Sequence, residues 1–308
     1  MVLKQAGLSV LVDLPGVGSG YQDHNAVYCP YKTNLTPEET LDGLWSGRYA
    51  QEDATSKNDP ILGWNACDIF GQIRPTETEV AELGGSFEKA WSQDFKNQPN
   101  KPFTLIAPVS GYLGDHQSVD PGQYITVVPY TAYPWSRGSI HITGYKPNDD
   151  VDFDCGFLSD PKDVTALMFA YKKTRELMRR TDMYRGEVIS GHPRFPPDSK
   201  AACITLADEG LKMDQVENLE YSDEDNKALE KWIREGVSST WHSLGTNKMA
   251  PREEMGVVDR SLNVYGVHGL KVVDLSIAPE NVGANTHNTA LVIGEKGADI
   301  IIKELKLV

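Results

Sequence analysis

The chain has 308 residues, 40% hydrophobic and 9% aromatic, which suffices for one large domain or two small ones with a sizeable core. Its formal net charge of −14 argues against binding to nucleic acid, because phosphate contacts need clustered Lys and Arg. The same acidity disfavours docking on an anionic membrane, and no stretch of the sequence is apolar enough to span a bilayer.

The cysteines and the two ends of the chain bear on compartment and metal binding. The cysteines are too far apart for a CxxC-type zinc site, and so few thiols favour a reducing compartment, with disulfides left open. Met1–Gly7 lacks the long apolar region of a signal peptide, and the final Lys306-Leu-Val308 is not a Ser-Lys-Leu peroxisomal signal. We predict a cytoplasmic protein without a metal site. The cysteines are Cys29, Cys67, Cys155 and Cys203.

Residues 8–14 are typical of a short buried strand that ends at Pro15 and a glycine-rich turn. The turn, Gly16-Val-Gly18-Ser-Gly20, invites comparison with a dinucleotide-binding loop, because such loops also follow a strand. However, the third glycine position is Tyr21, and residues 22–25 do not open a helix that could receive a pyrophosphate. We predict that this loop is not a dinucleotide site. The sequence contains no complete GxGxxG and no GxSxG nucleophile elbow.

The middle of the chain predicts a sheet that follows a loop-rich region. Residues 36–98 are polar, with helical stretches near Glu77–Phe95. Residues 103–145 alternate as strands do, most clearly in Tyr124–Tyr130 and Ser139–Thr143. This run predicts a mostly antiparallel sheet with one covered face.

Two helices with clear start signals are predicted after this sheet. The first follows Ser159 or Asp160 as a cap, with Pro161 in its first turn. Its buried face carries Val164, Leu167, Met168 and Tyr171. Residues 191–222 are loop-like, and Ser222 with Asp225 resembles a capping pair for the second helix. The apolar side of that helix carries Leu229, Trp232 and Ile233.

The C-terminal part predicts a strand and a last helix. Lys271–Asp274 is interpreted as a buried strand. The helix begins near Asn285 or Thr286, and its apolar residues include Leu291, Ile301 and Leu305.

Two C-terminal segments carry groups suited to chemistry. The first is Thr240-Trp241-His242-Ser243-Leu244-Gly245-Thr246, and the second runs from Val272 to Pro279 and on from Asn281 to Lys296. They resemble the C-terminal motifs of the glucose–methanol–choline oxidoreductases, and within that family they are most similar to fungal alcohol (methanol) oxidases. Further segments that resemble the family, in the same order, are Leu11–Gly18, Gln22–His24, Tyr133–Thr143, Asn263–Gly266 and Gly269–Asp274.

The resemblance implies an α+β fold. It implies a substrate-binding domain with a mostly antiparallel sheet flanked by helices, together with the C-terminal remnant of an FAD-binding domain. Residues 1–30 would be a remnant of the FAD-binding region, residues 31–235 the substrate-binding domain, and residues 236–308 the FAD-domain segment with the catalytic motifs.

The resemblance also implies roles for individual residues. His242 matches the family's catalytic histidine, and a neutral imidazole, with an ordinary pKa of about 6.5, suits removal of a hydroxyl proton. Asn285 matches the residue that holds the substrate oxygen, and its amide can donate to a developing alkoxide without titrating. The α-carbon would deliver hydride to N5 of the flavin. The residues expected along FAD are Trp241, Asp274, Ala284, Asn285 and Thr286.

Each of these residues has a plainer interpretation. A histidine is more often a structural hydrogen-bonding residue than a catalyst, and Asn285 alone would be an ordinary helix N-cap. His24 and His141 are interpreted as structural. His287 would either point at the substrate or pack on the last helix.

Complete members of the family carry an N-terminal GxGxxG half that supplies most FAD contacts, and the resemblance here begins past that half. We therefore expect a truncated or split form that binds FAD poorly alone. The apolar surface normally covered by that half would favour a separate N-terminal partner or a homo-oligomer.

The expected substrate is a small-molecule alcohol, either a small alkanol or a secondary-metabolite alcohol, with oxygen or another acceptor receiving the electrons. A flavin-free alternative stays open, either a binding protein or a lyase, isomerase or cyclase that reuses the pocket, and so does an inactive remnant. The family also admits a peroxisomal location.

Overall fold

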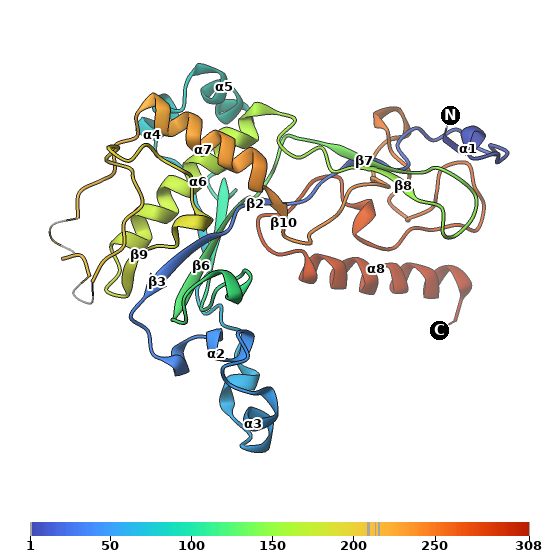
Figure 1. Cartoon of the computed structure of the whole chain (residues 1–308). Coiled ribbons are helices and arrows are strands. Elements are labelled where there is room, and N and C mark those ends of the chain that lie inside the picture. Colours follow the sequence, from blue (N-terminus) through green and yellow to red (C-terminus); the bar gives the residue numbers. More distant parts are fainter. Residues whose placement is uncertain (1, 208–209, 213, 215, 308) are drawn as a thin grey trace. The chain divides into compact units, whose positions relative to one another are not determined.

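The computed structural model describes residues 2–207, 210–212, 214 and 216–307 (Figure 1). By its internal contacts the chain divides into two units, each assembled from segments that are separate in the sequence. The first unit combines Met1–Asn25, Ala132–Asp163 and Ser239–Val308, and the second combines Ala26–Thr131 and Val164–Ser238. The functional assignment of residues 1–30, 31–235 and 236–308 stays a prediction.

The second unit contains an antiparallel sheet around strand β6 (Tyr124–Thr131), every residue of which is buried. Strand β5 (Thr104–Val109) pairs with one edge of β6, and β3 (Cys29–Thr33) pairs with the other. Beyond them lie β4 (Gly71–Ile73) next to β5 and β9 (Tyr184–Glu187) next to β3. A central strand covered on both faces needs apolar side chains on both, as Ile125, Val127 and Val128 provide. The predicted antiparallel sheet is confirmed, but the single covered face is wrong at β6, whose residues are buried on both faces.

Short helices and strands occur in both units. The predicted helical stretch near Glu77–Phe95 is confirmed as α4 and α5. The short helices are α1 (Val2–Gln5), α2 (Asp42–Trp45), α3 (Gln51–Ser56), α4 (Glu77–Glu82) and α5 (Gly85–Asp94), and the short strands are β2 (Asn25–Ala26) and β10 (Ser238–Ser239).

Helix α6 (Pro161–Arg179) begins where the sequence predicts it. The Asp160 carboxylate accepts a hydrogen bond from the Lys162 backbone N–H at 2.9 Å, which satisfies a donor that the first turn leaves unpaired. Val164, Leu167 and Tyr171 are buried on one face, as the i, i+3, i+7 spacing requires.

Helix α7 (Asp223–Gly236) confirms the predicted capping pair. Ser222 accepts from the Asp225 backbone N–H, and the Asp225 side chain accepts from the Ser222 backbone N–H, so two terminal donors are satisfied reciprocally. Leu229 and Ile233 are fully buried. The ring of Trp232 lies 5.4 Å from that of Tyr171, which joins α7 to α6.

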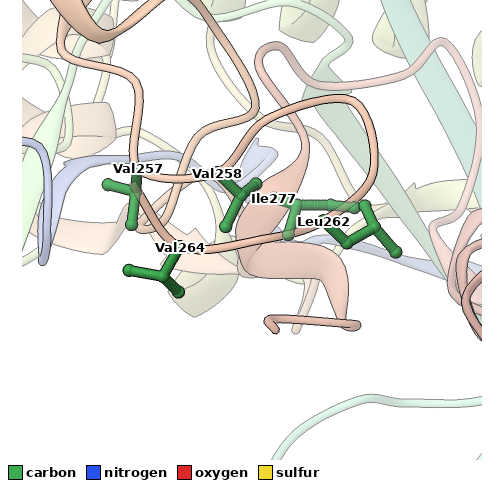
Figure 2. Close-up of a cluster of buried hydrophobic side chains, with 5 residues drawn as sticks. All are labelled: Val257, Val258, Leu262, Val264 and Ile277. Atoms are coloured by element: carbon green, nitrogen blue, oxygen red, sulfur yellow. The ribbon is translucent and has the colours of Figure 1, made fainter. Parts of the chain in front are cut away.

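The first unit has a smaller antiparallel sheet and a separate apolar cluster. The sheet has the order β1 (Ser19–Tyr21), β7 (Gly138–Ile142) and β8 (Val151–Asp154). Strand β1 begins at Ser19, within the glycine-rich segment Gly16–Gly20, so this segment leads into a strand and does not open a helix. Figure 2 shows the cluster of Val257, Val258, Leu262, Val264 and Ile277.

Helix α8 (His287–Leu305) lies against this cluster through Ile293 and Ile300. At Gly297 of this helix a Cβ atom would stand 2.1 Å from Val273 Cγ1, so a larger residue there would require Val273 to shift. Most of its apolar side chains stay exposed, including Leu291, Val292 and Leu305. Coverage of that surface by a partner or a second copy stays a prediction. No helix among the described residues has the length and apolarity needed to cross a bilayer.

Two predicted strands are wrong. Residues 8–14 form no strand, and Leu11 is 91% exposed. Lys271–Asp274 forms only an isolated bridge between Lys271 and Asn263. In both places the alternation of apolar residues occurs in a loop. A strand also needs a neighbouring segment whose backbone N–H and C=O groups can hydrogen-bond with it, and the alternation pattern does not show whether one is present.

A buried ion pair links α6 to β9 within the second unit. Arg175 Nε donates to Glu187 Oε1 at 2.7 Å, and both side chains are at most 1% exposed. Arg175 Nη1 also donates to the Ala201 carbonyl at 2.7 Å, and Glu187 Oε2 accepts from the Ile204 backbone N–H at 2.9 Å. The pair is therefore fully hydrogen-bonded, which a buried pair needs to offset its desolvation.

Removing one member of this pair should destabilise the second unit strongly. We expect Glu187→Gln to lower the free energy of unfolding by about 3–5 kcal/mol, because the Arg175 charge would stay buried and uncompensated. Urea unfolding followed by circular dichroism measures the change. The matched control is Lys231→Ala, which breaks an exposed pair with Glu235 and should cost less than about 1 kcal/mol. Equal losses in both variants would contradict the assignment.

Candidate functional site

Two distant segments of the first unit meet at the buried side chain of His24. Its Nδ1 lies 2.9 Å from Nδ1 of His242, and its Nε2 lies 2.9 Å from the carbonyl oxygen of Val282. The two imidazole rings stand nearly perpendicular, 4.9 Å apart between centroids. The structure thus ties the loop that carries His242 and the loop that leads to Asn285 to one side chain.

Asp23, next to His24, holds the His242 loop by several hydrogen bonds. Its side chain is 1% exposed. Oδ1 accepts from the backbone N–H of His242 at 3.1 Å, and Oδ2 accepts from Ser239 Oγ at 2.5 Å and from the Tyr21 hydroxyl at 3.2 Å. A buried carboxylate needs such donors in place of water.

Trp241 stands in a left-handed backbone conformation, with a φ of 61°. A bulky residue at such a φ is strained by about 1–3 kcal/mol. Its backbone N–H donates to Ser239 Oγ at 2.7 Å, and Ser239 in turn donates to Asp23. The strained turn leaves the Trp241 side chain 81% exposed, so the ring presents a flat apolar face beside His242.

Burial shifts the acid–base behaviour of both histidines. Burial, and then the neighbouring His242, lower the pKa of His24 to about 4. Partial burial also lowers the pKa of His242, while the Asp23 carboxylate raises it. Both rings are therefore neutral near pH 7.

The segment after residue 278 is fastened to the same region through Gln22. Its side-chain amide donates to the Pro279 carbonyl at 3.3 Å and accepts from the Asn281 backbone N–H at 3.2 Å. Asn285 is exposed, and Thr286 is the N-cap of α8, which confirms the predicted start of that helix.

The remaining candidates lie around these two loops. Ala284 is exposed, and so is His287 in the first turn of α8. Asp274 is exposed and accepts from the Ser276 backbone N–H at 2.8 Å, where it caps the short helix η7 (Leu275–Ile277). The roles expected for these side chains stay predictions. Among the described residues, no cluster of three or more His, Cys, Asp or Glu side chains could hold a metal ion.

Sequence reasoning missed how His24 and Asp23 organise the site. It assigned His24 a structural role, although the run Gln22-Asp23-His24-Asn25 offered a signal. Every residue of that run is buried. Consecutive polar residues are usually buried only where hydrogen-bond partners compensate for the loss of water.

Comparisons with known proteins identify the family of the chain. The model of the family described as GMC oxidoreductase matches residues 134–294. Alcohol oxidase 1 of Komagataella phaffii is 38% identical, with 98% of this chain and 53% of the relative covered. The alcohol oxidase of Candida boidinii is 37% identical, with the same shares of 98% and 53%. The chain thus spans about half the length of the curated relatives it matches.

Solved structures share the fold. A formate oxidase of Aspergillus oryzae, studied for its FAD modification, has a TM-score of 0.77 at 21% identity, covering 99% of this chain and 50% of that one. A fungal aryl-alcohol oxidase has a TM-score of 0.63 at 22% identity, covering 99% and 51%. The predicted α+β architecture is confirmed.

The depressed pKa of His24 predicts acid sensitivity. The unfolded chain takes up a proton at His24 with a pKa of about 6.5, whereas the folded chain does so only near pH 4. The unfolded state therefore binds more protons between these values, and stability falls as the pH drops through this window, by up to about 1.4 kcal/mol per pH unit.

Denaturant unfolding across this pH range should show a shallower fall for His24→Asn than for the unsubstituted protein. His192, in the second unit, has a pKa of about 4 through burial and keeps its own share of the slope. His268→Asn, at an exposed loop position, is the control and should follow the unsubstituted protein. An unchanged slope in His24→Asn would show that His24 does not titrate in this way.

Proposed function

The chain belongs to the glucose–methanol–choline (GMC) oxidoreductase family, and we propose that it carries the catalytic part of an FAD-dependent oxidoreductase that oxidises an alcohol to an aldehyde. One observation carries the proposal. Contacts of His24 with His242 and Val282 hold the His242 loop and the loop leading to Asn285 at one point of the first unit. An alcohol oxidation needs these two groups, a neutral base and a hydrogen-bond donor, close together.

The exposed groups around His242 fit one side of a flavin ring. Trp241 offers an exposed aromatic face, and Ala284 and Asn285 are exposed immediately before α8. Thr286 and Asp274 would complete the contacts of this chain with FAD. When bound, FAD would accept the hydride that leaves the α-carbon of the alcohol. The partly positive N-terminal end of α8 would favour negative charge on that cofactor.

His242 would remove the proton of the substrate hydroxyl. Its Nδ1 is engaged by His24 and by Thr240 Oγ1 at 2.9 and 2.8 Å, so the role falls to Nε2. The lowered pKa keeps the ring neutral and able to accept a proton near pH 7. Asn285 would donate its amide hydrogen to the same oxygen as negative charge develops there.

The substrate class follows from the relatives. Relatives at 37% and 38% identity are named alcohol oxidases, which supports a small-molecule alcohol as the substrate of this protein. Oxygen is the electron acceptor we propose, since the solved neighbours include a formate oxidase and an aryl-alcohol oxidase.

Substitution of His242 tests the proposal directly. The chain would be produced together with an N-terminal half of the kind that supplies most FAD contacts in complete family members, checked for the visible absorbance of bound flavin, and assayed for peroxide formation with short primary alcohols. We expect His242→Ala to lower kcat by about 10²–10⁴-fold through loss of the base, and Asn285→Ala by about 10²–10³-fold. His268→Ala is the control.

Full activity in His242→Ala would refute the assignment of the base. Binding or turnover of an organic ligand that depends on His242 in protein without flavin absorbance would instead refute the redox function and favour a flavin-free use of the pocket.

A further inference from the structure

We propose that His24 is a positioning residue that fixes the tautomer of His242, placing the ring proton on Nδ1 and the proton-accepting lone pair on Nε2. The inference deepens the proposed function. It rests on that function in one respect, namely that the proton received by Nε2 comes from the substrate hydroxyl. It follows from hydrogen-bond geometry within the first unit, where a chain of groups runs from the half-buried Val282 through the buried His24 to the half-buried His242.

The proton of His24 is placed by its backbone partner. A carbonyl oxygen can only accept, so the contact of 2.9 Å between His24 Nε2 and the Val282 oxygen requires a hydrogen on Nε2. His24 is fully buried and neutral, and a neutral imidazole carries a single ring proton. His24 also hydrogen-bonds the backbone of Ala132. Because the 2.9 Å contact with Val282 holds the single hydrogen on Nε2, we infer that Nδ1 of His24 accepts.

The proton of His242 follows from this. Two ring nitrogens 2.9 Å apart form a hydrogen bond only if one of them donates. Because His24 Nδ1 accepts, His242 Nδ1 must carry the hydrogen. In the neutral ring of His242, Nε2 then has no hydrogen and holds the basic lone pair.

Thr240 is compatible with the same tautomer. Its Oγ1 lies 3.2 Å from the His24 backbone carbonyl and 3.4 Å from Asp23 Oδ1, and both of these oxygens accept. When the single hydroxyl hydrogen of Thr240 is donated to one of them, its lone pairs can accept from a hydrogen on His242 Nδ1, which lies 2.8 Å away.

The arrangement reverses the preference of the free side chain. A neutral histidine in water favours the hydrogen on Nε2, which would leave Nδ1 as the base, turned toward the protein. With His24 and Thr240 both accepting at Nδ1, the lone pair sits at Nε2. When Nε2 takes a proton, Nδ1 keeps its two acceptors, and the buried Asp23 carboxylate, bonded to the His242 backbone N–H, favours the charged ring.

Nitrogen NMR of the chain labelled with ¹⁵N-histidine tests the proposal without flavin or substrate. Protonated and unprotonated ring nitrogens differ widely in chemical shift, and His242→Gln assigns the signals by their loss. We expect Nδ1 of His242 to be protonated and Nε2 unprotonated near neutral pH. A hydrogen on Nε2 of His242 in the unsubstituted protein would overturn the proposal.

Two variants of His24 distinguish an effect on the His242 tautomer from a merely structural role. His24→Phe keeps a planar ring but offers no acceptor, and should shift the tautomer ratio of His242 toward the Nε2-protonated form by roughly fivefold, the worth of one hydrogen bond. His24→Asn keeps a carboxamide oxygen near the position of Nδ1 and should restore much of the original ratio. His268→Phe, on the surface, should leave it unchanged.

An unchanged ratio in His24→Phe would also overturn the proposal. If His24→Phe fails to fold, as its backbone amide spectrum would show, Thr240→Val removes the second acceptor and should shift the ratio in the same direction. The tautomer is read in protein without cofactor, so a failure of alcohol oxidation and a failure of this inference appear in different measurements.

Discussion

The candidate site depends on the hydrogen bonds of one fully buried side chain, His24. Through its two ring nitrogens it joins residues 218 and 258 positions away in the sequence. Such long loops cost conformational entropy to close, and neither the His242 loop nor the segment before α8 belongs to a regular strand or helix that would hold it in place. Hydrogen bonds in a dry interior are directional and costly to leave unmade, so they fix these loops more closely than apolar contact would.

Asp23 complements His24 by fixing the backbone of the same loop. The left-handed conformation of Trp241 costs about 1–3 kcal/mol, and a hydrogen bond to a charged group is worth about 1.5–3 kcal/mol. The bonds that Asp23 accepts from His242 and Ser239 are therefore of the right size to offset the strain. In this strained turn the Trp241 ring is exposed, while the next residue, His242, contacts the buried His24.

The fold could be predicted where local chemistry decides the structure. The capping pair Ser222 and Asp225 could be predicted because its partners are close in sequence. The strand Tyr124–Thr131 was predicted from alternation, and its burial on both faces was not predicted. The strands expected at residues 8–14 and 271–274 were wrong, because a strand is defined by a partner that the pattern cannot name. His242 and Asn285 were found through resemblance to a family. His24 was interpreted as structural because its importance lies in partners more than 200 positions away.

The basicity of His242 is a balance between burial and one carboxylate. Burial alone would favour the neutral ring and make each protonation costly, whereas the Asp23 charge lowers that cost. Asp23 exerts its effect from the backbone side of the loop, where it bonds the His242 N–H and not the ring. His24 occupies the ring itself and, being neutral, can accept a hydrogen bond without forming an ion pair that would trap the imidazolium. A carboxylate in the place of His24 would hold His242 protonated to higher pH and remove the base. A neutral, buried histidine at this position instead keeps Nε2 able both to accept a proton and to release it.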